Sequence, residues 1–102
     1  MRLLWLSNQL SALPSELHAL RFVTILKLKY NRFKTLPRVL LELKFLTVLE
    51  LSGNEISVID DIVKDLATLK ELDLSGNRLT HLPEALCQMP ALEVIQQSLD
   101  FY

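Results

Sequence analysis

The chain has 102 residues, of which 50% are hydrophobic, and its formal net charge at pH 7 is −1. This length allows one domain, and the charge balance excludes the strongly basic surface typical of proteins that bind nucleic acid or anionic membranes. The single cysteine, Cys87, excludes an internal disulfide. It is predicted to be a half-buried structural thiol in a reducing, cytoplasmic protein.

A hydrophobic pattern repeats along the chain with an asparagine at the same place in each unit. The asparagines recur every 23 residues and are Asn8, Asn31, Asn54 and Asn77. Hydrophobic residues stand five and three residues before each asparagine, and others follow it at fixed distances. Self-similarity with a period of about 20 to 50 residues is typical of stacked repeat units. We therefore predict a single domain, residues 1–102, with about four repeats and a partial C-terminal unit.

The residues before each asparagine predict short parallel strands. Alternation places two apolar residues on one face of a strand and the residue between them on the other. In the second to fourth units these triplets are Leu26-Lys27-Leu28, Leu49-Glu50-Leu51 and Leu72-Asp73-Leu74. The same frame in the first unit places Leu3 and Trp5 in the core and Leu4 outside. Each asparagine is expected to satisfy unpaired backbone groups within its own unit and the next.

The second half of each unit predicts an outer helical or 3-10 turn. Three units have a proline before this segment, at Pro14, Pro37 and Pro83, and the third unit has Asp60 instead. Proline suits this position because its missing N–H is not needed at the start of a helix. A carboxylate there can accept hydrogen bonds from free N–H groups. We therefore expect Asp60 to cap the third outer segment and to make it the most helical.

The complete pattern, LxxLxLxxNxLxxLPxxLxxL, covers the whole chain and resembles the leucine-rich repeat in its 23-residue intracellular form. Similar repeats occur in Ras-pathway scaffolds and in cell-polarity scaffolds such as Scribble and Erbin. The resemblance implies an α/β fold, a short horseshoe segment of a leucine-rich-repeat solenoid with a parallel inner sheet and outer helical or 3-10 turns. It also implies a scaffold or interaction module that binds another protein, without catalysis and without a cofactor.

The concave face is the candidate binding surface, because solenoids usually bind partners there. Its predicted partner-binding residues are Lys27, Lys29, Tyr30, Arg32, Glu50, Glu55, Asp73 and Arg78. The second unit is basic and the next two are mainly acidic, while Leu4 and Leu6 are expected to add an apolar patch at the N-terminal end. Tyrosine and arginine are favoured interface anchors. The alternative is that these charges only keep the face solvated.

Glu50 and Asp73 hold the same strand position in adjacent units, so their Cβ atoms are expected to lie about 5 Å apart. Paired carboxylates at such a spacing can act in acid–base catalysis. An open, solvated face next to Lys27 favours a non-catalytic interpretation instead. No catalytic, cofactor-binding or metal-binding residue is therefore predicted.

Three functions stay open from the sequence. The preferred one is binding of a protein partner on the concave face. The alternatives are a recognition or regulatory segment of a larger signalling enzyme, such as a kinase, GTPase or phosphatase assembly, and a structural spacer. No nucleic-acid or membrane partner is expected. The chain starts at a strand and stops shortly after Asp100, so its apolar ends are expected to be uncapped. Either it belongs to a longer array, or its ends pair with another chain, including a second copy.

Overall fold

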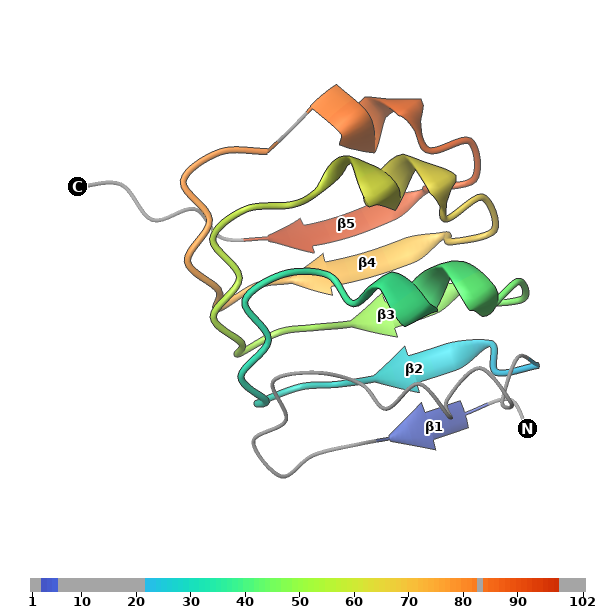
Figure 1. Ribbon diagram of the computed structural model, residues 1–102, viewed down its shortest axis with the longest axis horizontal. Coiled ribbons are helices and arrows are strands. Elements are labelled where there is room, and N and C mark those ends of the chain that lie inside the picture. Colours follow the sequence, from blue (N-terminus) through green and yellow to red (C-terminus); the bar gives the residue numbers. More distant parts are fainter. Residues whose placement is uncertain (1–2, 6–21, 83, 98–102) are drawn as a thin grey trace.

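Residues 3–5, 22–82 and 84–97 are described by the computed structural model, with side chains for 22–82 and 84–96. Within these ranges the strands form one five-stranded sheet in chain order, and each neighbouring pair is parallel (Figure 1). The strands are β1 (Leu3–Trp5), β2 (Ile25–Lys27), β3 (Val48–Glu50), β4 (Glu71–Leu74) and β5 (Val94–Gln97). The predicted parallel inner sheet is confirmed.

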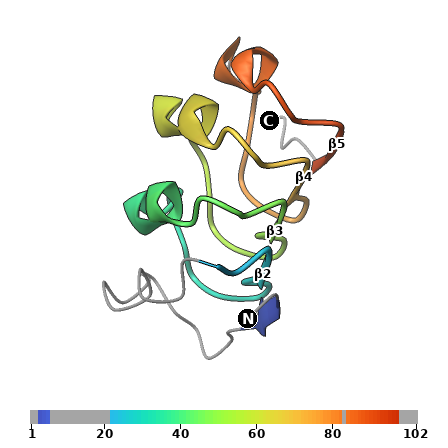
Figure 2. The same ribbon diagram turned by 90° about the vertical axis from the view of Figure 1, so that its right-hand side faces the viewer.

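The outer side of each complete described unit is a 3-10 helix. The helices are η2 (Arg38–Glu42), η3 (Asp61–Asp65) and η4 (Glu84–Gln88). They lie above one another on the side opposite the sheet, so each unit is one coil of strand, loop, helix and return loop (Figure 2). No helix in the described ranges is long and apolar enough to cross a membrane.

The prediction for Asp60 was wrong. Helix η3 has five residues, as η2 and η4 do, and the Asp60 side chain makes no capping hydrogen bond. Its backbone instead copies that of Pro37, with φ −71° and ψ 158° against φ −65° and ψ 135°. The Pro37 carbonyl accepts a hydrogen bond from the Leu40 N–H, and the Asp60 carbonyl accepts one from the Val63 N–H, each at 3.2 Å. This position therefore requires an extended backbone, which proline favours and aspartate can also adopt.

Leucines of the strands fill one side of the core. The two apolar residues of each triplet are at most 1% exposed, and they are Leu26, Leu28, Leu49, Leu51, Leu72 and Leu74. The outer helices fill the other side with the buried residues Leu40, Val63 and Leu86. Because neighbouring strands lie only about 4.8 Å apart, equivalent side chains of successive units stack in continuous columns. The predicted alternation is confirmed for the second to fourth units.

The first unit has a different register from the one that we predicted. Successive leucines pair at an interval of 23 residues from β2 onward, as Leu26 does with Leu49. Between β1 and β2 the interval is 22 residues, so Leu4 pairs with the buried Leu26 and Trp5 pairs with Lys27. The predicted register, in which Leu3 aligns with Leu26 and Trp5 with Leu28, was wrong.

The first unit is one residue shorter than the others between its strand and its asparagine, and this difference explains the shift. The second unit has two residues between its last strand leucine, Leu28, and Asn31, whereas only Ser7 separates Leu6 from Asn8. The constant asparagine period conceals this deletion, because the strand is one residue closer to its asparagine in the first unit. A one-residue slip exchanges the two faces of a strand. Leu6 and Asn8 themselves lie outside the described residues.

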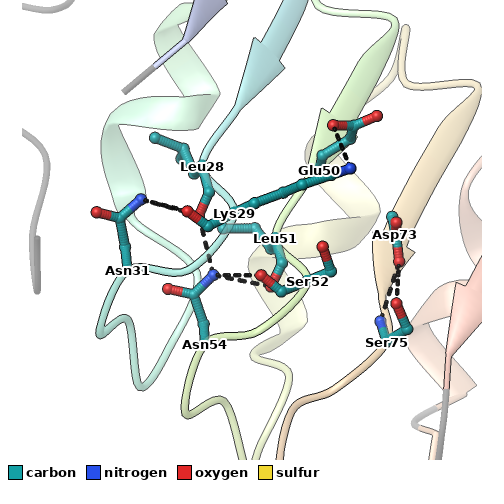
Figure 3. A network of polar contacts seen from close by, with 9 residues as sticks. All are labelled: Leu28, Lys29, Asn31, Glu50, Leu51, Ser52, Asn54, Asp73 and Ser75. Carbon is teal, nitrogen blue, oxygen red and sulfur yellow. Dashed lines mark hydrogen bonds and ion pairs between the residues drawn. The ribbon is translucent and has the colours of Figure 1, made fainter. Parts of the chain in front are cut away.

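The buried asparagines join neighbouring units. The Nδ2 group of Asn54 donates to the carbonyls of Leu51, in its own unit, and Leu28, in the preceding unit, at 2.8 and 3.0 Å (Figure 3). Its Oδ1 accepts from the N–H of Phe33 at 3.1 Å. Asn77 repeats this arrangement one unit later. Asn54 and Asn77 thus satisfy backbone groups of their own unit and of the preceding unit, not of the next unit as the sequence predicted.

Candidate binding site on the concave face

The in-register sheet arranges the predicted concave residues in one row. Lys27 pairs with Glu50, Glu50 with Asp73, and Asp73 with Gln96. Lys27, Glu50 and Asp73 are half-buried, because the leucines on either side of each one point into the core, and Gln96 is exposed. We refer to these four residues as the middle row.

A second row, whose members are not among the predicted binding residues, lies beside the middle row. It consists of the in-register residues Ile25, Val48, Glu71 and Val94 at the starts of the strands. Val94 is 43% exposed, and the others are half-buried or exposed. The sequence did contain the signal, because the alternation that places Lys27 on this face also applies two residues earlier. We refer to these residues as the entry row.

An ion pair crosses the concave face between the second and third units. Lys29 Nζ lies 3.6 Å from Glu50 Oε2, and the two side chains are 37% and 21% exposed (Figure 3). The Oε2 atom is buried and has no hydrogen-bond partner, since 3.6 Å exceeds the usual length of a hydrogen bond. Partly exposed pairs of this kind contribute only about 0–1 kcal/mol.

Asp73 is held by its own unit. Its Oδ1 accepts hydrogen bonds from the backbone N–H and the hydroxyl of Ser75 at 3.0 and 2.7 Å (Figure 3). Glu50 and Asp73 are therefore adjacent in register but have different partners. In the described part of the chain, no group of three or more histidine, cysteine, aspartate or glutamate side chains could hold a metal ion.

The carboxyl end of the sheet carries the remaining predicted residues. Arg78 Nη1 lies 3.9 Å from Glu55 Oε1, which links the loops of the fourth and third units. Arg32 is exposed, and Tyr30 is 76% exposed. The structure thus brings all eight predicted residues onto one side of the sheet or its adjoining loops. Their role in binding stays a prediction.

Tyr30 has an unusual backbone conformation. Its φ is 57°, in the left-handed region, and the equivalent positions of the next two units are Gly53 and Gly76, with φ of 72° and 68°. The left-handed region disfavours residues with a Cβ by about 1–2 kcal/mol. The Tyr30 N–H donates to the Ser52 carbonyl at 3.0 Å, which holds the residue in place. Exposed aromatic surface is thus present where a glycine is the less strained choice.

A hollow lies across β3, β4 and β5 on the concave face, with a volume of about 120 Å³. Residues of both rows line it, including Val48, Glu50, Glu71, Asp73 and Val94. Its polar lining comes from three carboxylates and Gln96, and its apolar lining includes two valines from the entry row. We refer to this feature as the acidic hollow.

Two exposed phenylalanines, Phe22 and Phe45, stack shortly before β2 and β3. Their ring centroids are 5.6 Å apart, and the residues are 58% and 52% exposed. Neither residue is among the predicted binding residues, although the two are 23 residues apart and lie outside the leucine columns. Cys87 is exposed on η4, so the prediction of a half-buried thiol was wrong.

Comparison with known proteins decides the family. The model for the leucine-rich repeat matches residues 46–96, which is half of the chain. This chain belongs to the leucine-rich repeat family. A leucine-rich repeat protein of Leptospira interrogans matches with a TM-score of 0.75 and 31% identity over 92% of this chain. The leucine-rich repeat domain of APL1B matches with a TM-score of 0.74, and at 23% identity this likeness shows the fold alone.

The chain spans only part of these relatives, covering 25% of the Leptospira chain and 31% of the APL1B chain. No curated protein sequence matches it. The predicted leucine-rich-repeat solenoid is confirmed. Leucine-rich repeat domains generally mediate protein–protein interactions and are typically non-enzymatic, so protein binding is the general function that membership of the family assigns.

Proposed function

We propose that this chain is a cytoplasmic, non-catalytic interaction module that binds a segment of a partner protein across its concave face. One contrast between neighbouring columns of the sheet carries the proposal. The core column has an aliphatic residue in every described unit, with Leu26, Leu49, Leu72 and Ile95 in register. The middle row beside it has a different polar residue in every unit. Stacking requires the first column, whereas the middle row is free to serve recognition.

The charge distribution on the concave face supports a directional interaction. Lys27, Lys29 and Arg32 make the second unit basic, while Glu50, Glu71 and Asp73 make the next two mainly acidic. A partner segment that crosses the strands therefore meets both signs of charge in a fixed order. Complementary charges accelerate association and select the register of the partner more than they raise affinity. The same surface would serve a free scaffold or the recognition segment of a larger signalling enzyme.

Reversing the charge of Arg32 tests the location of the binding surface. Short random peptides displayed on phage would be selected against the intact chain, and the enriched peptides synthesised. We expect Arg32→Glu to weaken their binding about tenfold, or ~1.4 kcal/mol, through slower association with a smaller salt dependence. Because Arg32 is exposed, the free energy of unfolding should change by no more than about 0.5 kcal/mol. Surface plasmon resonance and urea unfolding measure the two effects.

The matched control is Lys64→Glu on η3, an exposed charge reversal on the outer side. It should leave peptide binding unchanged. Loss of binding in Lys64→Glu but not in Arg32→Glu would place the interaction on the convex side. Peptides that tolerate every change on the concave face would favour the interpretation of that face as merely solvated, and of the chain as a spacer.

We also expect the chain to self-associate. At the C-terminal end of the described stack, Leu82, Leu86, Leu92 and Ile95 line a largely apolar hollow between η4 and β5. Apolar patches of this kind are rarely left in contact with water. Sedimentation velocity should therefore give a mass that rises with protein concentration, and Leu92→Gln should reduce this rise. A sharp monomer at every concentration would disprove self-association.

A further inference from the structure

We infer that the acidic hollow receives a cationic side chain, preferably an arginine, from the bound protein segment. The inference rests on the proposed function and specifies the chemistry that a partner must present. The hollow lies on the unpartnered face of β3, β4 and β5, and its volume of about 120 Å³ is of the scale of one side chain.

The arrangement of the two rows gives the hollow apolar flanks and an acidic centre. In the entry row, Glu71 lies in register between Val48 and Val94. In the middle row, Glu50 and Asp73 are adjacent in register. A side chain that lies along β4 over Glu71 therefore has Val48 on one side and Val94 on the other. The carboxylates of Asp73 and Glu50 lie farther along the strands.

Arginine and lysine match this combination. Each has an aliphatic stem that gains from contact with apolar groups and a charged head that stays near polar groups. The valines can contact the stem, while Glu71, Glu50 and Asp73 attract the head. Lys29 pairs with Glu50, and Lys27 lies beside Glu50 in register, whereas Glu71 and Asp73 lie one strand farther away, on β4. Binding of a cation would also reduce the repulsion among carboxylates on neighbouring strands.

The buried oxygen of Glu50 favours arginine over lysine. Glu50 Oε2 has no hydrogen-bond partner, and Lys29 is too distant at 3.6 Å to supply one. A guanidinium group has five N–H donors in a planar fork and can bond to two carboxylate oxygens at once. The Lys29 side chain is 37% exposed and its ion pair is weak, so an arginine head can displace it.

The position of the basic second unit predicts where an acidic residue should stand in the partner segment. Lys27 lies on β2, two strands away from the centre of the hollow on β4, which corresponds to roughly 10 Å at the usual strand spacing. An extended chain advances about 3.3–3.6 Å per residue. A segment that crosses the strands should therefore carry an acidic residue about two to four positions from the basic residue in the hollow.

A double-mutant cycle tests this inference with the selected peptides whose binding depends on Arg32. We expect these peptides to contain an arginine or lysine. Where this basic residue is an arginine, replacing it by citrulline, its neutral isostere, should weaken binding at least tenfold. Glu71→Gln in the protein should weaken binding of the arginine peptide similarly but should leave the citrulline peptide almost unaffected. Glu71 is an exposed residue, whereas Asp73 supports Ser75 and is unsuitable for this purpose.

The matched control is Glu84→Gln, the same exchange at an exposed site on η4, which should not alter binding. Peptides that require Arg32 but lack a basic residue, or that bind equally with citrulline, would overturn the inference and leave the proposed function intact. Peptides that are indifferent to both Arg32→Glu and Glu71→Gln would overturn the proposed function as well. Failure to enrich any peptide would count against both.

Discussion

Replacing Asn54 by alanine is expected to lower the free energy of unfolding by about 2–4 kcal/mol. The largest contribution comes from the Phe33 N–H, which is paired with Asn54 Oδ1 and would be left unsatisfied in the core. The Leu28 and Leu51 carbonyls lose less, because Asn31 and Asn77 also donate to them, at 3.0 and 2.9 Å. Because the Asn54 side chain bonds to backbone groups of both the second and the third unit, this one asparagine stabilises two units.

Urea unfolding followed by circular dichroism would measure this effect. The control is Gln88→Ala on η4, which removes an exposed amide side chain. It should change the free energy of unfolding by no more than about 0.5 kcal/mol. Asn77→Ala should resemble Asn54→Ala, because it removes the same set of bonds one unit later. An Asn54→Ala protein as stable as Gln88→Ala would mean that the asparagines do not hold the units together.

The repetition of the chain explains why its fold could be predicted. The same core position recurs in several units, and Leu26, Leu49 and Leu72 show that it is aliphatic each time. A misassigned residue in one unit therefore does not change the predicted fold. The repetition does not help in the first unit, because the register of its strand can be inferred only from its own residues. There the asparagine spacing stays at 23 residues while the strand is displaced by one.

The candidate site could be predicted only in part. Alternation placed Lys27, Glu50 and Asp73 correctly in one row, because backbone periodicity determines which face a side chain occupies. It did not predict that Glu50 pairs with Lys29 while Asp73 turns to Ser75, since these contacts depend on side-chain torsions. The entry row was not predicted, because three of its four residues, Ile25, Val48 and Val94, are apolar, whereas the prediction relied on charged residues.

The left-handed position shared by Tyr30, Gly53 and Gly76 leads to the second large expected effect. We expect Gly53→Ala to lower the free energy of unfolding by about 2–3 kcal/mol. Part of this loss is the backbone cost of φ 72° for a residue with a Cβ. The rest comes from Tyr30, because a Cβ on Gly53 would lie 2.5 Å from Cδ1 of its ring. The ring would have to move away from the surface that it now covers.

Gly76→Ala separates the two contributions. Its φ is 68°, so the backbone cost is similar, but its nearest contact would be the Gly53 nitrogen at 3.3 Å and no aromatic ring. We expect Gly53→Ala to be the more destabilising of the two by about 1 kcal/mol. In a Tyr30→Gly background that difference should disappear, because the ring is absent. Denaturation of the single and double variants measures this coupling, and strict additivity would show that Tyr30 does not rest on Gly53.

Tyr30→Gly alone links this strain to function. Glycine removes the left-handed strain but adds freedom to the unfolded chain, so stability should stay unchanged or rise by up to about 1 kcal/mol. If the tyrosine is an interface anchor, the same change should weaken peptides that depend on Arg32 by about tenfold or more. Improved or equal stability together with weaker binding would mean that the strain at position 30 is maintained for recognition. Unchanged peptide binding would remove Tyr30 from the site and leave its conformation as a local feature of the second unit.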